Sequence, residues 1–270
     1  MKVLLLLPLL FMLLTTPVSG QNSKLADQYY LEGEYQKAGD LYLKLHETAK
    51  KNGNFIYFNK YIECLLALRE YDQAEKEIQA QMKAQPDDFS MLVTLGNVQE
   101  RIGNYEAAQA SYRMAIEKLP ARIDAITRLG NAFLSQAKYD EAIVTYEKGE
   151  KLLDKPGIFS YQLADLYKRN GDISKMIEQY LYSLQSSPDR LENIQNMLQR
   201  SLKAEDYDEL LSQLYVFIQD YPETDYFPEM LAWTFMQQKD YSKAMRQAKA
   251  LDKRMGENGL RVYRLASIAA

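Results

Sequence analysis

The stretch "GNYEAAQASYRMAIEKLP", residues 103–120, decides the fold because its order of residues returns elsewhere in the chain. After a turn it places small and aromatic residues at fixed offsets and then a proline: Tyr105, Ala108, Tyr112, Ala115 and Pro120. At a distance of 34 residues, "AKYDEAIVTYEKGEKLLD" carries Tyr139, Ala142 and Tyr146 at the same offsets. A period of this length indicates an array of similar units rather than one globular core.

Four positions recur together along the chain. Residues equivalent to Tyr105 are 34 apart, except for a first interval of 36, at Tyr35, Tyr71, Tyr105, Tyr139, Ile173, Tyr207 and Tyr241. Three residues later stand Ala38, Ala74, Ala108, Ala142, Met176, Leu210 and Ala244. Small residues recur nine positions earlier at Ala26, Gly96, Gly130, Ala164 and Ala232, and prolines fifteen positions later at Pro86, Pro120, Pro188 and Pro222. The pattern therefore defines seven copies.

The spacing within one copy predicts two helices. In "SMLVTLGNVQER", residues 90–101, the apolar and small residues return at helical spacing and define one face. Gly103 is suited to the left-handed conformation that closes this helix, as are Gly33 and Gly171 in their copies. A second helix is expected over residues 105–118, and Pro120 prevents it from continuing.

Small residues mark the place where the two helices cross. Bulky side chains would hold the backbones apart, so we expect Gly96 and Ala108 at the close approach and Leu95, Tyr105 and Tyr112 in the flanking space. Asp87 or Asp88 is the expected N-cap of the first helix of this copy, the one over residues 90–101.

This unit resembles the tetratricopeptide repeat, a 34-residue helix–turn–helix with small residues at its eighth and twentieth positions and a proline near its end. "LGNVQERIGNYEAAQASYRMAIEKLP" matches that pattern almost throughout. The resemblance implies an all-α fold, a right-handed superhelix of about seven repeats and a partial eighth. The expected repeats are 21–52, 55–88, 89–122, 123–156, 157–190, 191–224, 225–258 and 259–270.

Three parts of the array depart from the pattern. The sixth copy carries Leu198 and Leu210 at positions where small residues are expected, so its helix crossing should be shifted or weaker. Ile62 occupies the small position of the second copy, and residues 50–54, "KKNGN", predict a longer turn before it. "RVYRLASIAA" is not a polar cap, which favours the hypothesis that the chain is a piece of a longer protein. A native mass that matches residues 21–270 would refute that hypothesis.

Composition and the first residues bear on the compartment. The charges nearly balance, with 33 basic and 37 acidic residues, which argues against a nucleic-acid partner. Residues 1–20 read as a secretory signal cleaved between Gly20 and Gln21, since the apolar run is too short to span a membrane. No cysteine lies near the cleavage point, so a lipoprotein is not expected, and Cys64, the single cysteine, is expected to be an inert buried thiol. These features predict a protein of the bacterial envelope or periplasm.

The resemblance implies that the first helices line a concave groove that binds a protein or an extended peptide. The candidate binding residues on that face are Asn97, Arg101, Asn131, Tyr161, Lys168, Arg169 and Trp233. Asn97 and Asn131 either form an amide ladder that binds a peptide backbone, or reflect only that asparagine is common at this position of the repeat. The three basic residues either bind a carboxylate or lie on a solvated face. Trp233, the sole tryptophan, is either a partner's anchor or part of the core. The lysine–asparagine clamp of chaperone-binding members is missing, because Val93 and Thr127 precede the two asparagines by four residues.

The chain shows no pattern of an enzyme or of a cofactor site. His46 is the only histidine, so a multi-histidine metal site is impossible, and neither a phosphate-binding glycine loop nor a Gly-X-Ser-X-Gly motif occurs. We therefore expect a non-catalytic interaction scaffold with no cofactor and no metal. The alternative is the sensing or docking portion of a longer envelope enzyme or signalling protein.

Overall fold

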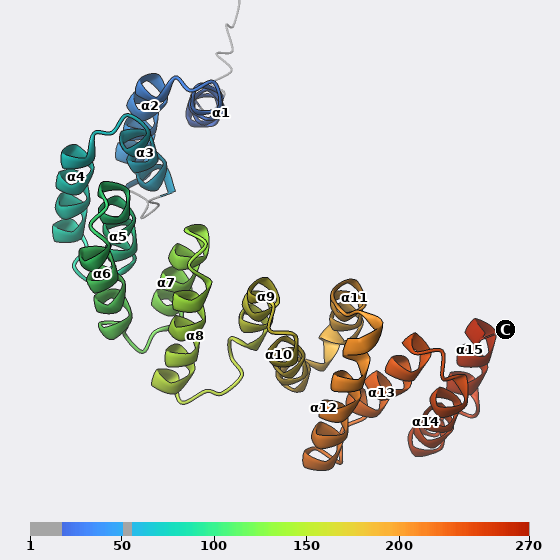
Figure 1. The fold of residues 1–270 in the computed structure, drawn as a ribbon. Helices are drawn as coiled ribbons and strands as arrows, with labels where there is room; N and C mark the ends of the chain where they lie inside the picture. Colours follow the sequence, from blue (N-terminus) through green and yellow to red (C-terminus); the bar gives the residue numbers. More distant parts are fainter. Residues whose placement is uncertain (1–17, 51–55, 270) are drawn as a thin grey trace, which may run out of the picture. The chain divides into compact units, whose positions relative to one another are not determined.

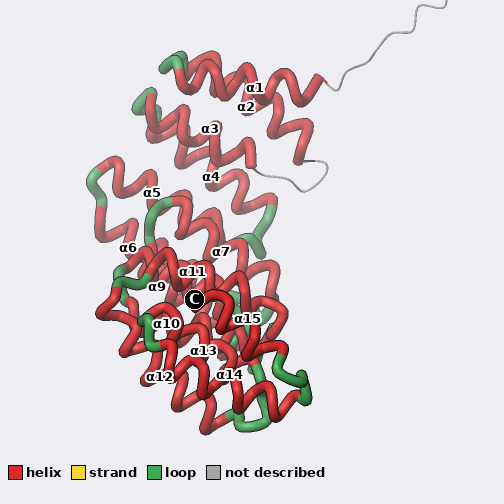
Figure 2. Tube along the Cα trace, turned by 90° about the vertical axis from the view of Figure 1, so that its right-hand side faces the viewer, coloured by secondary structure: helices red, strands yellow, loops and turns green. Residues whose placement is uncertain are grey.

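A computed structural model describes residues 18–50 and 56–269. These residues form fifteen α-helices and no strand (Figures 1 and 2). The helices are α1 (Val18–Leu31), α2 (Tyr35–Lys50), α3 (Ile56–Ala67), α4 (Tyr71–Ala84), α5 (Ser90–Ile102), α6 (Tyr105–Glu117), α7 (Ile123–Ser135), α8 (Tyr139–Leu153), α9 (Ser160–Asn170), α10 (Ile173–Ser186), α11 (Leu191–Ser201), α12 (Tyr207–Asp220), α13 (Tyr226–Gln237), α14 (Tyr241–Met255) and α15 (Leu260–Ala269). Two short 3₁₀ helices, Pro188–Arg190 and Ala204–Asp206, flank α11.

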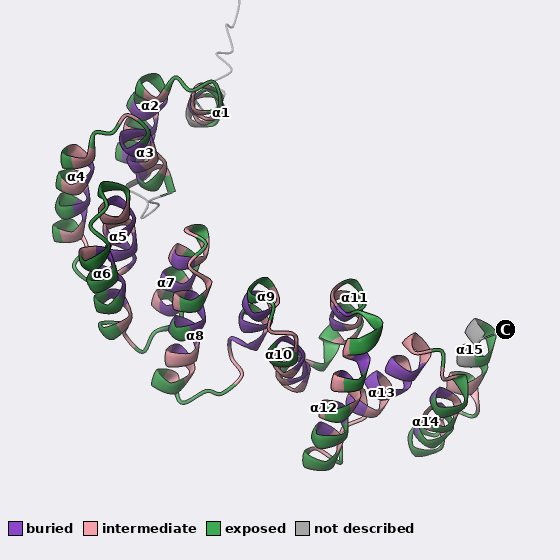
Figure 3. Ribbon diagram, in the orientation of Figure 1, coloured by how far each residue is buried: buried purple, intermediate pink, exposed green. Residues whose placement is uncertain are grey.

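The chain divides into two compact units. Unit 1 comprises Met1–Asp87 and Thr94–Ser111, and unit 2 comprises Asp88–Val93 and Tyr112–Ala270. Within each unit, consecutive helices pack as antiparallel pairs, for example α1 with α2 and α9 with α10, and their buried faces meet (Figure 3). The predicted helix–turn–helix organisation is confirmed.

The recurring residue of each copy is the first residue of its second helix, from Tyr35 in α2 to Tyr241 in α14. Just before it, the chain turns through a residue with positive φ, which allows the next helix to run back along the first. Gly33, Gly103 and Gly171 occupy this place with φ of 79°, 88° and 78°, as predicted. In three other copies the left-handed residue is not glycine but Arg69, Ala137 or Lys239.

Small residues do lie at the helix crossings. The alanines of the second helices, Ala108 among them, are fully buried. In unit 2, a Cβ added to Gly130 of α7 would lie 2.5 Å from Cζ of Tyr146 in α8, and one added to Gly149 would lie 2.5 Å from Cγ2 of Ile126. These two glycines therefore set the distance between α7 and α8.

Tyrosines fall into two structural classes, and one prediction about them is wrong. Tyr112 is buried as expected, but Tyr105 is 68% exposed and does not fill the space beside the crossing. The first residue of a helix lies at its end, beyond the region where the paired helices are closest. The tyrosine seven positions later in the repeat is the buried one, as the examples Tyr42, Tyr112, Tyr146 and Tyr180 show.

The sixth copy has the irregular packing that its leucines predict. Leu198 and Leu210 are both fully buried, and among the described residues α11 and α12 approach each other far less than α9 and α10 do. Instead of a left-handed turn residue, the 3₁₀ helix Ala204–Asp206 joins them. α12 packs mainly against α10 and α13, so its neighbours hold it in the array.

Four further predictions concern the signal, the longer turn, the N-cap and the single cysteine. Residues 51–54 of the predicted longer turn and residues 1–17 of the predicted signal lie outside the described residues. Asp88 lies one residue before the N-cap position, Phe89, and accepts a hydrogen bond from the backbone N–H of Ser90, the first residue of α5, at 3.1 Å; it thus binds the start of the helix from one position earlier than predicted. Cys64 is buried, and burial raises the pKa of its thiol to about 11, so the thiol is protonated at neutral pH.

Candidate functional site

A tyrosine of the second helix and a polar residue of the first helix, fifteen positions earlier, form a recurrent pair. In unit 1 the Tyr42 hydroxyl donates to Oδ1 of Asp27 at 2.6 Å. In unit 2 the Tyr146 hydroxyl donates to Oδ1 of Asn131 at 3.3 Å. Asn131, a predicted peptide-binding residue, is therefore already used as an acceptor within its own repeat.

Tyr180 occupies the same place in the fifth repeat, fifteen positions after Asp165, but its hydroxyl is fully buried and has no hydrogen-bond partner among the described residues. Burial, and then the negative charge of Asp165, raise the pKa of Tyr180. Tyr180→Phe should therefore leave the free energy of unfolding unchanged or raise it by up to about 1 kcal/mol. Tyr42→Phe should lower it by about 1 kcal/mol, because it removes a short bond to a carboxylate. Guanidinium titrations of both variants test this, and equal losses would contradict it.

The predicted basic residues do not gather into one site. Arg101 is exposed on α5 in unit 1, whereas Lys168 and Arg169 lie on α9 in unit 2. Arg169 forms an ion pair with Asp165 at 2.8 Å, one turn earlier on the same helix. The charge of Arg169 is thus partly compensated, while Lys168 is half-buried.

Asn97 and Tyr161 have separate surroundings. Asn97 lies on α5 in unit 1 and is 9% exposed, so little of its side chain is accessible. Tyr161 lies on α9 in unit 2, where its ring packs edge-on against Tyr180 with centroids 6.2 Å apart. The guanidinium of Arg190 lies 5.3 Å from the Tyr161 ring centroid, a cation–π contact that leaves this tyrosine half-buried.

Unit 1 contains a hollow of about 390 Å³ between the first helices α1 and α3. Its lining residues are Asp27, Tyr30, Leu31, Tyr42, Lys60 and Glu63. Lys60 forms a close ion pair with Asp27 and lies 5.2 Å from the Tyr42 ring centroid. The hydrogen bonds from Lys60 and Tyr42 lower the pKa of Asp27, so this carboxylate is ionised and engaged within the protein.

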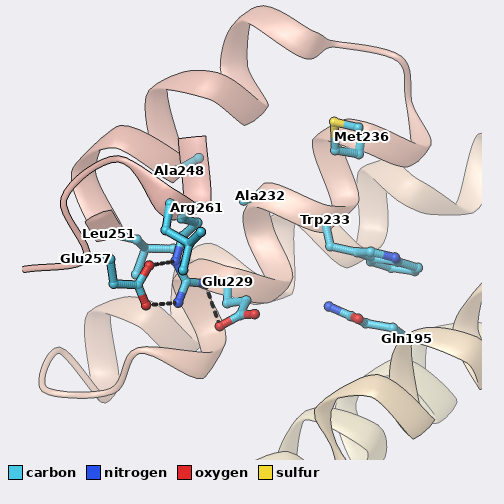
Figure 4. A pocket seen from close by; sticks show the side chains of 10 residues that line it. Gln195, Glu229, Ala232, Trp233, Met236, Ala248, Leu251, Glu257 and Arg261 are labelled. Atoms are coloured by element: carbon cyan, nitrogen blue, oxygen red, sulfur yellow. Dashed lines mark hydrogen bonds and ion pairs between the residues drawn. The ribbon is translucent and has the colours of Figure 1, made fainter. Parts of the chain in front are cut away.

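The seventh repeat replaces the tyrosine–polar pair with Trp233 and Ala248. Ala248 is fifteen residues after Trp233, as Tyr146 is after Asn131, and the methyl group of alanine fills far less space than a phenol ring. A pocket of about 280 Å³ lies at this place (Figure 4). Its lining residues are Gln195 of α11, Glu229, Ala232, Trp233 and Met236 of α13, Ala248 and Leu251 of α14, Glu257, and Leu260 and Arg261 of α15.

Trp233 belongs to the wall of this pocket. The indole is half-buried, with the Tyr207 ring centroid 6.3 Å away, and the amide of Gln195 lies across from it (Figure 4). Of the apolar lining residues, Met236 is half-buried, whereas Ala232, Ala248 and Leu251 are 7%, 1% and 3% exposed and form the floor of the pocket. A pocket with apolar walls and a few polar groups at its edge suits a buried side chain of a ligand.

Arg261 closes one side of the pocket. Its guanidinium forms two hydrogen bonds with Glu257, each 2.9 Å long, and an ion pair of 2.8 Å with Glu229 (Figure 4). These contacts, with that of Glu257 foremost, raise the pKa of Arg261, which is therefore permanently charged. Asp252 accepts from the backbone N–H of Gly259 at 2.8 Å and so orients the start of α15. Carboxylates on α13 and α14 thus hold α15 beside Trp233.

Sequence reasoning selected Trp233 because it is unique, but it did not identify the pocket. The signal was available in this register, where four tyrosines, Ile78 and Leu214 are all large and Ala248 alone is small. Glu229, Glu257 and Arg261 belong to no motif, and only the packing of α15 brings them together.

Among the described residues, no group of three or more histidine, cysteine or acidic residues could hold a metal ion. His46 is buried against Phe58, with ring centroids 5.1 Å apart. None of the helices formed by residues 18–50 and 56–269 has both the length and the apolar character of a membrane span.

Comparisons with known proteins agree with this repeat architecture. Family models described as tetratricopeptide repeat match residues 65–123 and 123–152. A TPR repeat-containing protein of Methanocaldococcus jannaschii is 29% identical over 162 residues, which are 59% of this chain. The match covers 28% of the length of that relative.

Solved structures to which the chain shows similarity at low identity include three repeat proteins. The TPR2AB domain of yeast Sti1 in its complex with pHSP90 is 18% identical, covering 93% of this chain and 96% of that one, with a TM-score of 0.32. A thermophilic TPR protein of Thermus thermophilus is 18% identical over 68% of this chain and 98% of its own, with a TM-score of 0.35. YrrB, described as having an unusual peptide-binding site, is 17% identical over 69% and 96%, with a TM-score of 0.33. The chain therefore contains tetratricopeptide repeats, matched directly over residues 65–152, and the consecutive helix pairs continue the same arrangement through the described residues.

Proposed function

We propose that the chain is a non-catalytic scaffold that binds an extended segment of a partner protein, and that the Trp233 pocket receives an apolar side chain of that segment. The observation that carries the proposal is the exchange of a tyrosine–polar pair for Trp233 and Ala248, with a pocket of about 280 Å³ in its place. Elsewhere in unit 2 the same position is filled from within, by Tyr146 and Tyr180.

The composition of the pocket supports a peptide rather than a small polar metabolite. The walls are apolar, and a half-buried tryptophan is the residue type most enriched among binding hot spots. The Gln195 amide can both donate to and accept from a peptide backbone. Solenoids of stacked repeats present such surfaces along successive first helices.

The other predicted residues take lesser roles in this proposal. Tyr161 and Lys168 extend the contact surface along α9, and Arg169 keeps its bond to Asp165. Asn131 is exposed and, while it accepts the 3.3 Å bond from Tyr146, it can still donate its amide N–H groups to a ligand. Asn97 and Arg101 belong to unit 1 and would serve a separate part of the partner.

Filling the pocket tests the proposal. A phage-displayed library of random 12-residue peptides is selected on the wild-type protein, and the enriched peptides are synthesised. Because Trp233 is the only tryptophan of the chain, its fluorescence reports the binding of tryptophan-free peptides at or near this pocket. We expect Ala248→Tyr to weaken binding at least tenfold. The double variant Trp233→Asn/Ala248→Tyr reproduces the asparagine–tyrosine pair of the fourth repeat. It should remain folded and fail to bind in the library assay.

Ala250→Tyr is the matched control, because it makes the same change at an exposed position of the same helix. It should bind like the wild type. Failure to enrich any peptide, or equal binding by Ala248→Tyr and the wild type, would refute the proposal.

We also propose that the scaffold acts in the bacterial envelope after export. The support is the basic and apolar character of residues 1–20, with Val18 and Gly20 at the positions that a signal peptidase reads. Cleavage there would remove Val18–Gly20 from α1. N-terminal sequencing of the native protein should begin at Gln21, and retention of Met1 would oppose export.

A further inference from the structure

We infer that the Trp233 pocket selects a partner segment in which the apolar anchor has a lysine or arginine within two positions. This inference rests on the proposed function and concerns the charge at the edge of the same pocket. The expected occupant of the pocket is a cationic segment of a partner protein.

The lining residues carry a surplus of negative charge. They include two carboxylates, Glu229 and Glu257, and one guanidinium, Arg261, so the formal charges −2 and +1 sum to −1. Gln195 and the remaining lining residues are neutral. Asp252 adds a further carboxylate nearby, where it accepts from the backbone N–H of Gly259 and of Arg261.

The geometry assigns the surplus charge to Glu229. Glu257 contacts the guanidinium with both of its oxygens, and such a two-bond arrangement matches one carboxylate to one arginine. Glu229 reaches Nη1 of Arg261 with Oε2 alone, and its side chain remains 40% exposed. Among the described residues, Arg261 is the one positively charged residue that lines this pocket.

A cation on the ligand would complete this cluster. It would form charge-assisted hydrogen bonds with Glu229 while the neighbouring apolar side chain occupies the space beside Trp233. An acidic residue at the same place would add a negative charge to a cluster whose net charge is already −1. Since Glu229 is partly exposed, we expect a preference of about fivefold in Kd for arginine over glutamine, within the range of exposed ion pairs.

Two parallel selections test the inference. The random 12-residue phage library is selected on the wild type and on Glu229→Gln, and the residues within two positions of the apolar anchor are counted. The wild-type pool should be enriched in lysine and arginine over aspartate and glutamate, and the Glu229→Gln pool should lose that bias. Glu205→Gln, an exposed carboxylate outside the pocket, is the control and should keep it.

The tightest wild-type peptide is then synthesised with arginine, glutamine or glutamate at the cationic position, and binding is followed by Trp233 fluorescence. The expected order of affinity is arginine, glutamine, glutamate on the wild type, and near equality of arginine and glutamine on Glu229→Gln. Equal binding of all three peptides to the wild type, with Ala248→Tyr still deficient, would overturn the inference and leave the proposed function intact. Binding that Ala248→Tyr does not weaken would overturn both.

Discussion

Gly130→Leu should lower the free energy of unfolding of unit 2 by about 3 kcal/mol, at the upper end of the cost of overpacking a core. A Cβ at this position would lie 2.5 Å from Cζ, 2.6 Å from Cε2 and 2.9 Å from Oη of Tyr146. Real Cβ atoms do not approach rings so closely, so α7 and α8 must separate or Tyr146 must leave its buried site. Leucine favours a helix over glycine by about 0.8 kcal/mol, which offsets only part of the cost.

Guanidinium unfolding followed by circular dichroism measures this loss, with Ala250→Leu as an exposed control within the same unit. The control should change stability by less than about 0.5 kcal/mol. If the contact with Tyr146 is the cause, Gly130→Leu/Tyr146→Ala should be less destabilised than the sum of the two single variants. Additive losses would mean that the close crossing of α7 and α8 is not what limits residue size at position 130.

The architecture was predictable because the repeat period fixes the position at which each helix begins. Residues such as Tyr35 and Tyr139 recur with the turns, so the sequence places the first residue of each second helix without further information. The glycine turns at Gly33 and Gly103 could be read directly. The turns at Ala137 and Lys239 could not, because only their position in the repeat, and not the residue type, demands a positive φ.

Burial within the repeat was harder to predict than its order. Tyr105 and Tyr112 have the same residue type and lie on the same helix, yet only Tyr112 is buried. Hydrophobic character therefore does not distinguish the end of a helix from the crossing. Comparison between copies does not separate them either, since the position of Tyr105 holds tyrosine in six of the seven copies, whereas the position of Tyr112 also holds Ile78, Leu214 and Ala248.

The pocket could be predicted only in part, because it results from a missing side chain. Trp233 is visible as a unique residue, but the space beside it exists because Ala248 stands where a tyrosine recurs. Arg261 joins the site through the packing of α15, which depends on the non-local partners Glu229 and Asp252. Such contacts leave no spacing in the sequence from which to infer them.

The sixth repeat shows what replaces close pairing when small residues are absent. Since α11 and α12 approach each other little, α12 depends on rings that connect it to its other neighbours. Phe217 of α12 packs against Tyr182 of α10 with centroids 5.0 Å apart and against Phe227 of α13 at 5.2 Å. One side chain therefore links the fifth and seventh repeats through the sixth.

Phe217→Ala should lower the free energy of unfolding by about 4 kcal/mol, because it removes a buried ring and leaves a cavity that α11 is not placed to fill. Tyr215→Ala is the control, since Tyr215 lies on the same helix and is 53% exposed; its effect should stay below about 0.5 kcal/mol. Hydrogen exchange locates the damage: in Phe217→Ala, amides of residues 191–220 should lose protection before those of α7 and α8, since stability in a repeat array is a sum of neighbour terms. A uniform loss of protection across unit 2 would instead mean that the sixth repeat unfolds together with the rest, and that its loose internal pairing has no energetic consequence.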